Sequence, residues 1–346
     1  MRRIFPSVIA IVWAIVAPAF AADQSVSPLL APLPTKAAPR DFDGFAPDPV
    51  PAWRAEFGAR FWFAQAKTGK SLYDNPALSN AMVSRLTYGG LDIGSAELFG
   101  RVSFPAGWFV KGYAGAGVVW NGQLQDEDFP PGIDPYSSTL SRQHNGNMGY
   151  ASTDVGYDFL RRPDYRIGAF AGFHYLREVV SAYGCNQTAT NPLVCEPAIP
   201  NTILGISQGN SWYSARVGLE GAVMLGNRLM LSAEGAWLPY VHLRGKDDHW
   251  LRIGTEVGDF MGAIPETGHG QGYQLEALLS YQLTQHAAVG IGARYWHMWA
   301  NGQANFSGEV VGVTAYPQPV DWKNDMLGVF LQASVKLDPY PLTFLH

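Results

Sequence analysis

Long segments of the sequence alternate between apolar and polar residues with a period of two, and amphipathic helical periodicity is almost absent. In 326–337 the odd positions from Leu327 to Leu337 are apolar, whereas the even positions include Gln332 and Ser334. The same alternation recurs in 212–223, 228–243, 273–283 and 287–299. Because successive side chains of a strand point to opposite faces, these segments predict strands with one apolar face and one polar face.

Further features favour a transmembrane barrel over a soluble sheet. Many of these segments are longer than the roughly 5 to 6 residues of a typical soluble strand. Only 15% of the residues are charged, compared with about a quarter in soluble domains. Tryptophans also lie near predicted strand ends, as in the interfacial girdles of membrane barrels. These are Trp62, Trp108, Trp120, Trp237, Trp296 and Trp299.

The connections alternate between short turns and long loops, which gives ten predicted strands. The turns lie near 105–107, 162–164, 226–227 and 284–285, and the loops cover 67–81, 122–147, 184–209, 244–269 and 301–322. The strands are predicted at 54–66, 82–104, 107–121, 148–161, 165–183, 210–225, 228–243, 270–283, 286–300 and 323–337. An even number of antiparallel strands with this alternation of connections is typical of outer-membrane β-barrels.

A closed ten-stranded sheet leaves no free edge, and its narrow interior should be filled by side chains. Charged residues on the polar faces are therefore expected inside the barrel, paired with one another in a structural role. They are Arg216, Glu220, Glu234, Glu276, Arg294 and Lys336. A crowded interior of this kind argues against a diffusion porin.

The N-terminus has the features of a secretory signal peptide. Arg2 and Arg3 precede the apolar run 4–17, and Ala19-Phe20-Ala21 supplies a small-x-small cleavage site. Removal of residues 1–21 takes away two positive charges and no acids, which changes the net charge from −5 to −7. The predicted organisation is a signal peptide at 1–21, a Pro/Ala-rich lead-in at 22–52, the barrel at 53–337 and a tail at 338–346.

Charge and cysteine content restrict the partners. The mature chain is acidic and has no Lys/Arg cluster, which argues against nucleic acid as a partner. The two cysteines, Cys185 and Cys195, lie close together in a predicted loop. In an exported chain they are expected to form a disulfide rather than remain free thiols. Because the C-x₂-C metal spacing is absent, we expect no metal site.

Two acidic motifs directly follow predicted strands. They are Gln125-Asp126-Glu127-Asp128-Phe129 and Lys246-Asp247-Asp248-His249-Trp250. Acidic clusters of this kind are usually solvated surface, and carboxylates also suit calcium. The histidine adds a third interpretation, since an aspartate two residues away can orient an imidazole. A facing carboxylate pair could then hold a water molecule that the imidazole deprotonates.

The strand count, the loop lengths and both motifs resemble the omptins, the outer-membrane endopeptidases of Gram-negative bacteria. The resemblance covers roughly 54–337. Asp126-Glu127-Asp128-Phe129 is similar to the Asp-x-Asp-aromatic motif of the family's second external loop, and Asp247-Asp248-His249 is similar to the dyad of its fourth. Further similar stretches are Ser141-Arg142 and Tyr165-Arg166-Ile167-Gly168 followed by Arg177.

The resemblance implies an aspartic-type endopeptidase in the Gram-negative outer membrane, with Asp126, Asp128, Asp247 and His249 as catalytic residues. Asp247 would orient His249, which would act as general base toward a water held by Asp126 with the support of Asp128. No cofactor is expected, although the family implies a dependence on lipopolysaccharide, for which Arg177 matches. The expected partners are a peptide or protein substrate and outer-membrane lipid, and the protein is expected to be a monomer.

The sequence departs from the family at positions that bind substrate. Acids that select basic residues in the family correspond to Lys70 and Gly245, the latter followed by Lys246. Cleavage beside basic residues is therefore not expected. The lipid-binding cluster is also changed, with Phe173 and Tyr175 in place of more polar residues. The alternative interpretation is a non-catalytic outer-membrane barrel for adhesion or ligand binding that retains the omptin architecture.

Overall fold

The computed structural model describes residues 53–74, 79–129, 135–191, 193–254, 261–306 and 317–337. The predicted signal peptide (1–21), lead-in (22–52) and tail (338–346) lie outside these residues. Among the described residues, no helix is long and apolar enough to cross a membrane.

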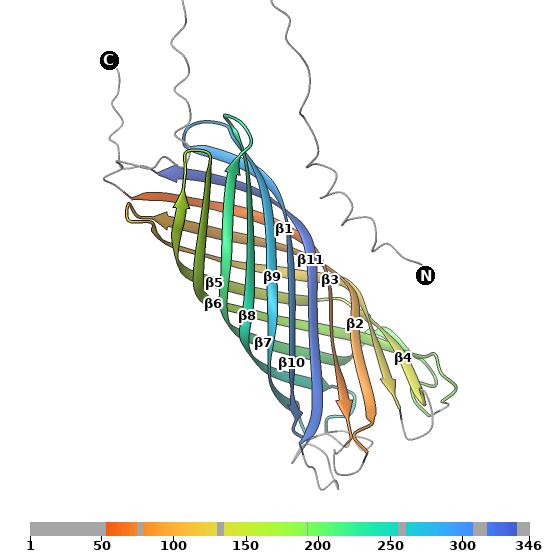
Figure 1. The fold of residues 1–346 in the computed structure, drawn as a ribbon. Coiled ribbons are helices and arrows are strands. Elements are labelled where there is room, and N and C mark those ends of the chain that lie inside the picture. The colour runs from red at the N-terminus through yellow and green to blue at the C-terminus, as the bar shows by residue number, and fades with distance from the viewer. Residues whose placement is uncertain are drawn as a thin grey trace, which may run out of the picture. The chain divides into compact units, whose positions relative to one another are not determined.

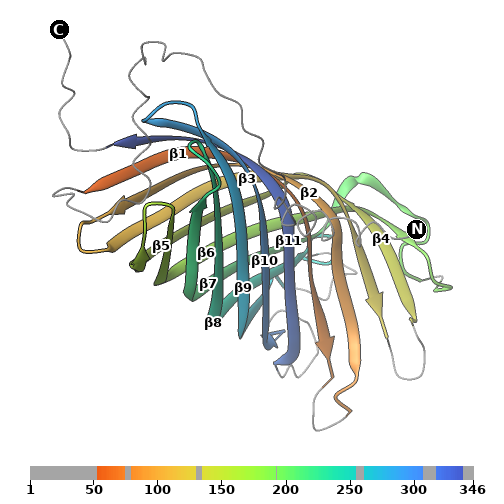
Figure 2. The same ribbon diagram turned by 45° about the horizontal axis from the view of Figure 1, so that its top comes forward.

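Eleven antiparallel strands form one sheet that closes into a ring, as Figures 1 and 2 show from two directions. The strands are β1 (Arg54–Tyr73), β2 (Met82–Ser103), β3 (Trp108–Asp128), β4 (Ser137–Gln143), β5 (Gly146–Arg161), β6 (Tyr165–Gln187), β7 (Ile199–Met224), β8 (Leu229–His249), β9 (Ile264–Gln282), β10 (Ala287–Ala304) and β11 (Gln318–Leu337). Strand β1 pairs with both β2 and β11, so the sheet has no free edge. The predicted all-β antiparallel barrel is confirmed.

The prediction of ten strands missed β4, which falls in the predicted loop 122–147. Strands β4 and β5 both pair with β3 on one side and β6 on the other, one after the other along the wall. Only His144 and Asn145 separate them. They therefore share one position in the ring, and the wall has ten positions built from eleven strands.

The outward faces carry apolar side chains, as the alternation predicted. On β11, Leu327, Val329 and Leu331 are 38 to 55% exposed, whereas Phe330 between them and Gln332 after them are buried. A continuous apolar outer surface is stable only against lipid, because in water it would drive association. The outer surface of the ring is therefore that of a membrane barrel.

The tryptophan girdle was predicted only in part. Trp108, Trp120 and Trp237 lie on the outside, about half exposed. Trp62 and Trp296 instead face the interior, only 1% exposed, with their ring centroids 4.8 Å apart. Both occupy even positions of strands whose even residues point inward, so register rather than distance from the strand end determines their location.

The interior of the barrel is filled by paired charges, as expected. Arg294 lies between Glu97, with Nη1 2.6 Å from Oε2, and Glu276, with Nη2 2.7 Å from Oε2. Glu220 accepts from Lys111 and Arg166 at 2.7 and 2.8 Å. A further set pairs Arg216 with Glu234 and Asp154 and Arg101 with Asp158 and Glu220. Lys336, also expected inside, is half-buried at the end of β11.

The strands extend well beyond the lipid. At about 3.3 Å per residue, the 21 residues of β8 span roughly 70 Å, whereas the hydrocarbon layer is about 30 Å thick. The exposed apolar residues of β8 run from Leu231 to Tyr240, near the short-turn end. Much of what was predicted as long loops is therefore strand that continues past the membrane, and β4 lies at this long-loop end (Figure 1).

Where the apolar outer surface ends on the long-loop side, irregularities in the strands reverse which side chains face inward. In β3, Phe109 and Val119 are buried at odd positions, but beyond Gly122, whose φ is +146°, the buried residue is Leu124. Strand β2 shows the same reversal at Gly90, with a φ of +59°. Glycine adopts such backbone angles without steric cost.

Strand β8 contains a separate bulge at Pro239 and Tyr240. The three residue steps of β8 from Leu238 to Val241 lie opposite only two steps of β9, from Gly272 to Gly270. Inward-facing positions are even up to Leu238 and odd from Val241 onward. One inserted residue thus turns the remainder of the strand over, because side chains alternate with a period of two.

Removing Arg294 should leave two buried carboxylates without their cation. We expect Arg294→Ala to lower the free energy of unfolding by about 3 to 5 kcal/mol. Arg85 provides the control, since it is 43% exposed in its ion pair with Glu127, and Arg85→Ala should cost less than about 1 kcal/mol. Equilibrium unfolding by guanidinium in phospholipid vesicles measures both, and equal losses would contradict this assignment.

Candidate functional site

The four predicted catalytic residues lie at the long-loop ends of two strands rather than in loops. Asp126 and Asp128 are among the last three residues of β3, and Asp247 and His249 are among the last three of β8. All four lie beyond the bulges described above and beyond the apolar outer surface. Strands β3 and β8 are on nearly opposite sides of the ring, so the two pairs face each other across its mouth.

The dyad is formed by a direct hydrogen bond. His249 Nε2 lies 2.9 Å from Asp247 Oδ2, and Asp247 is only 3% exposed. Burial opposes ionisation of Asp247, but Lys70 and His249 outweigh it and hold the Asp247 pKa well below its usual range. Burial also lowers the His249 pKa, yet the charge and hydrogen bond of Asp247 produce a net increase. Asp247 therefore orients the ring and stabilises its protonated form.

The carboxylate pair on β3 titrates differently. Burial and the neighbouring charge of Asp128 raise the pKa of Asp126 to about 7, against the opposing effect of His249. Burial also raises the pKa of Asp128. The His249 charge lowers the pKa of Asp126, and the Asp126 charge raises the pKa of His249, so the two titrations are linked. Near neutral pH the site can thus hold or release a proton between them.

Lys70 is a buried part of this cluster. The sequence predicted it as a substrate-binding residue in the first long loop, but it lies on β1, inside the barrel and 4% exposed. Its Nζ is 2.7 Å from Asp247 Oδ2, donates to Gln208 Oε1 at 2.9 Å and pairs with Glu266. These acceptors belong to β8, β7 and β9, so the Lys70 side chain crosses the interior.

Sequence reasoning missed Glu266 and Gln208, both assigned to loops. Glu266 and Gln274 both occupy even positions of β9, and both are buried. Continuing the alternation of the predicted strand 270–283 back to residue 266 would therefore have placed Glu266 on the inward face. The signal is weak because, at this end of the strand, the outward face meets water and the inward face meets polar groups, so neither face requires apolar residues. The apolar alternation that identifies membrane strands is then absent.

The other predicted residues surround or lie apart from the cluster. Gly245 lies under Glu266, since a Cβ there would come within 2.6 Å of the Glu266 Oε2 atom. Lys246 is exposed and pairs with Asp248 at 3.2 Å, on the opposite face of β8 from the dyad. Arg177, predicted to bind lipopolysaccharide, is exposed on the outward face of β6, away from the interior.

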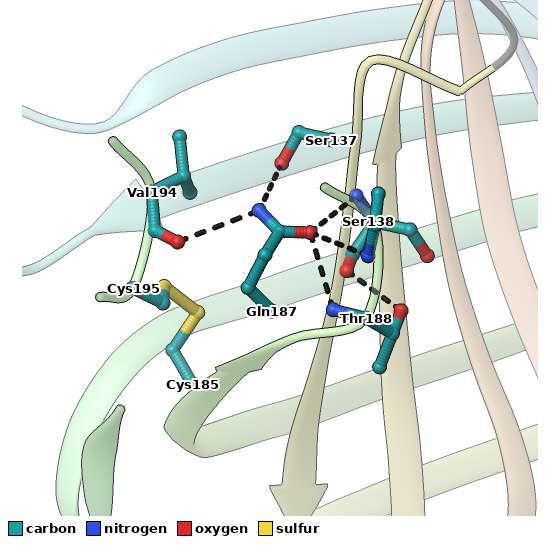
Figure 3. The surroundings of a disulfide bond; sticks show 8 residues. Ser137, Ser138, Cys185, Gln187, Thr188, Val194 and Cys195 are labelled. Carbon is teal, nitrogen blue, oxygen red and sulfur yellow. Dashed lines mark hydrogen bonds between the residues drawn. A yellow bond between two sulfur atoms is a disulfide. The ribbon is translucent and has the colours of Figure 1, made fainter. Parts of the chain in front are cut away.

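The disulfide reinforces the strand beside Asp126 and Asp128. Cys185 and Cys195 are joined, and the segment between them packs against β4 (Figure 3). The side chain of Gln187 accepts from the Ser138 amide at 2.9 Å and donates to the Ser137 hydroxyl at 3.0 Å. Strand β4 pairs in turn with the end of β3, with Asp126 opposite Thr139 and Asp128 opposite Ser137.

The described residues contain no group of three or more His, Cys, Asp or Glu side chains arranged to hold a metal ion. The site described above brings together the carboxylates of Asp126 and Asp128, the imidazole of His249 bonded to Asp247, and the buried ammonium group of Lys70.

Comparison with known proteins supports the fold and leaves the family open. No protein-family model matches the chain. No curated protein matches its sequence. Among solved structures, the outer membrane protease OmpT from Escherichia coli aligns with a TM-score of 0.59 at 15% identity, covering 81% of this chain and 96% of OmpT. This similarity shows a shared barrel fold.

Other outer-membrane barrels align with lower scores. OprG from Pseudomonas aeruginosa has a TM-score of 0.34 at 11% identity, covering 83% of this chain and 97% of OprG. The attachment invasion locus protein Ail of Yersinia pestis has a TM-score of 0.23 at 10% identity, covering 80% of this chain and 98% of Ail.

The hydrogen bond between Asp247 and His249 predicts how the histidine titrates. The His249 pKa should lie above 6.5, and Asp247→Asn should lower it because the stabilising charge is lost. Asp248→Asn is the matched control, since Asp248 pairs with Lys246 and should leave the His249 pKa unchanged. Carbon-13 NMR titration of histidine-labelled protein, assigned with His249→Gln, measures these values; an unchanged pKa in Asp247→Asn would contradict the dyad.

Proposed function

We propose that the protein is an outer-membrane endopeptidase that hydrolyses peptide bonds with a water molecule activated between Asp126 and His249. The observation that carries the proposal is the Asp247–His249 hydrogen bond facing a carboxylate pair with which His249 is electrostatically coupled. The OmpT-like barrel, with apolar outer faces, supports a location in the outer membrane, where lipid and lipopolysaccharide surround the chain.

The proposed mechanism follows from the contacts of each group. Asp247 accepts a hydrogen bond from His249 Nε2, which fixes the tautomer and leaves proton transfer to Nδ1. His249 removes a proton from water held against Asp126, with Asp128 supporting the carboxylate pair. The resulting hydroxide attacks the peptide carbonyl carbon directly, so no covalent enzyme intermediate forms. Asp247 stabilises the imidazolium until its proton passes to the departing amine.

A second candidate function is a non-catalytic barrel that binds a ligand or a host surface through the same mouth. The position of Lys70 favours it, because its ammonium group shares Asp247 Oδ2 with His249. A carboxylate that already carries a buried cation stabilises the imidazolium less. Hydrolysis decides between the two candidates, since only the first requires His249 to exchange a proton.

Loss of either half of the site should abolish peptide hydrolysis. We expect His249→Ala and Asp126→Asn each to lower kcat/KM by several orders of magnitude, because the groups act as a unit. A peptide-library digest with protein reconstituted in lipopolysaccharide-containing vesicles measures the effect. Asp248→Asn should retain activity close to wild type. Cleavage by His249→Ala at the wild-type rate would refute the protease proposal.

The rate should depend on pH in the direction set by His249. A general base must be unprotonated, so kcat/KM should rise with pH through an apparent midpoint above 6.5, the ordinary histidine value. The midpoint belongs to the coupled His249 and Asp126 pair. Asp247→Asn should move it to lower pH while also reducing the rate. If kcat/KM stayed constant between roughly pH 5 and pH 8, the range in which histidine titrates, His249 could not be the general base.

A further inference from the structure

The Lys70 ammonium group occupies a built binding site. Three acceptors on three neighbouring strands converge on it: Asp247 Oδ2 at 2.7 Å, Gln208 Oε1 at 2.9 Å and a Glu266 carboxylate oxygen. Lys70, Asp247 and Glu266 are each less than 5% exposed. Two buried carboxylates and an amide oxygen form an arrangement that recognises any primary ammonium group.

One of the acceptors, Glu266, is itself held in place by neutral groups. Glu266 Oε2 accepts from Gln208 Nε2 at 2.8 Å and from Trp322 Nε1 at 3.2 Å. Gly245 has no side chain, and the Glu266 carboxylate fills the space in which one would lie. The orientation of Glu266 toward Lys70 therefore does not depend on Lys70 alone.

The ammonium site is adjacent to the proposed chemistry. Asp247 Oδ2 contacts both Lys70 Nζ and His249 Nε2, so a single oxygen atom separates the site from the dyad. A small hollow continues alongside Lys70, lined by Tyr88, Leu86, Asn210 and Trp322 among others. Without the Lys70 side chain this hollow would extend to Asp247 Oδ2, beside the dyad.

We infer that Lys70 fills a lysine-binding subsite of the enzyme with a lysine of its own chain, so that substrates carry a short, uncharged residue beside the scissile bond. The inference rests on the proposed function. A long basic side chain finds its position already taken. An acidic side chain in this position would meet the two buried carboxylates of Asp247 and Glu266 and be repelled by them.

Emptying the subsite should expose its affinity for ammonium groups. Lys70→Ala removes the side chain, and n-butylammonium, which has the same four-carbon chain, should then bind. Lys70→Met is the matched control, because it removes the same charge but fills the space. Isothermal titration calorimetry should detect binding to Lys70→Ala and none to wild type or Lys70→Met. Glu266→Gln added to Lys70→Ala should weaken binding by about tenfold or more.

The same variants should change cleavage specificity. In a peptide-library digest, wild type should cleave beside short, uncharged residues. Lys70→Ala should raise kcat/KM for peptides with Lys at this position by about tenfold or more relative to Lys70→Met. Native barrel content, checked by heat-dependent electrophoretic mobility, should be equal in all variants.

The outcomes separate the inference from the proposed function. Binding of n-butylammonium by Lys70→Ala without peptide hydrolysis by wild type would support the subsite and refute the protease. Hydrolysis by wild type without binding or altered specificity in folded Lys70→Ala would refute the subsite. A wild-type preference for Lys or Arg would also overturn the inference, even if Lys70→Ala failed to fold.

Discussion

Each wall position of the closed sheet is hydrogen-bonded on both sides, and the rest of the structure depends on this constraint. Backbone groups in lipid have no water to bond, so the ring must close without edges. Once register is fixed, the position of a residue in its strand decides whether its side chain faces lipid or the interior. Leu331 and Gln332 are adjacent in sequence, yet they face opposite environments for this reason alone.

The same constraint determines how a polar site can be built on top of a membrane barrel. Gly90, Gly122 and the bulge at Pro239 and Tyr240 lie near the place where the apolar surface ends on the long-loop side. On the membrane side of these positions, the strand register points apolar side chains toward lipid. On the long-loop side, the reversed alternation points Asp126 and Asp247 inward. Local insertions in three strands thus convert wall segments into a site without disturbing the membrane-spanning part.

Burial makes the charges of the site interdependent. An isolated carboxylate in this interior would be protonated, and Asp126, whose pKa is raised to about 7, approaches that condition. Asp247 remains ionised because Lys70 and His249 compensate it. The cation that stabilises Asp247 is also the group that fills the space beside the dyad. The ionisation of the buried acids and the space available beside the dyad are therefore linked through Lys70.

The sequence by itself determined the antiparallel barrel, its lipid face and the two acidic motifs at its mouth. It could do so because lipid imposes an apolar residue at every second position of a strand. Beyond the membrane both faces meet water or polar groups, the alternation disappears, and β4 and the upper part of β9 were read as loops. Only the tertiary structure decided that Lys70 and Glu266 join Asp247, because their contact depends on strands brought together across the ring by closure and on one-residue bulges that the alternation does not reveal.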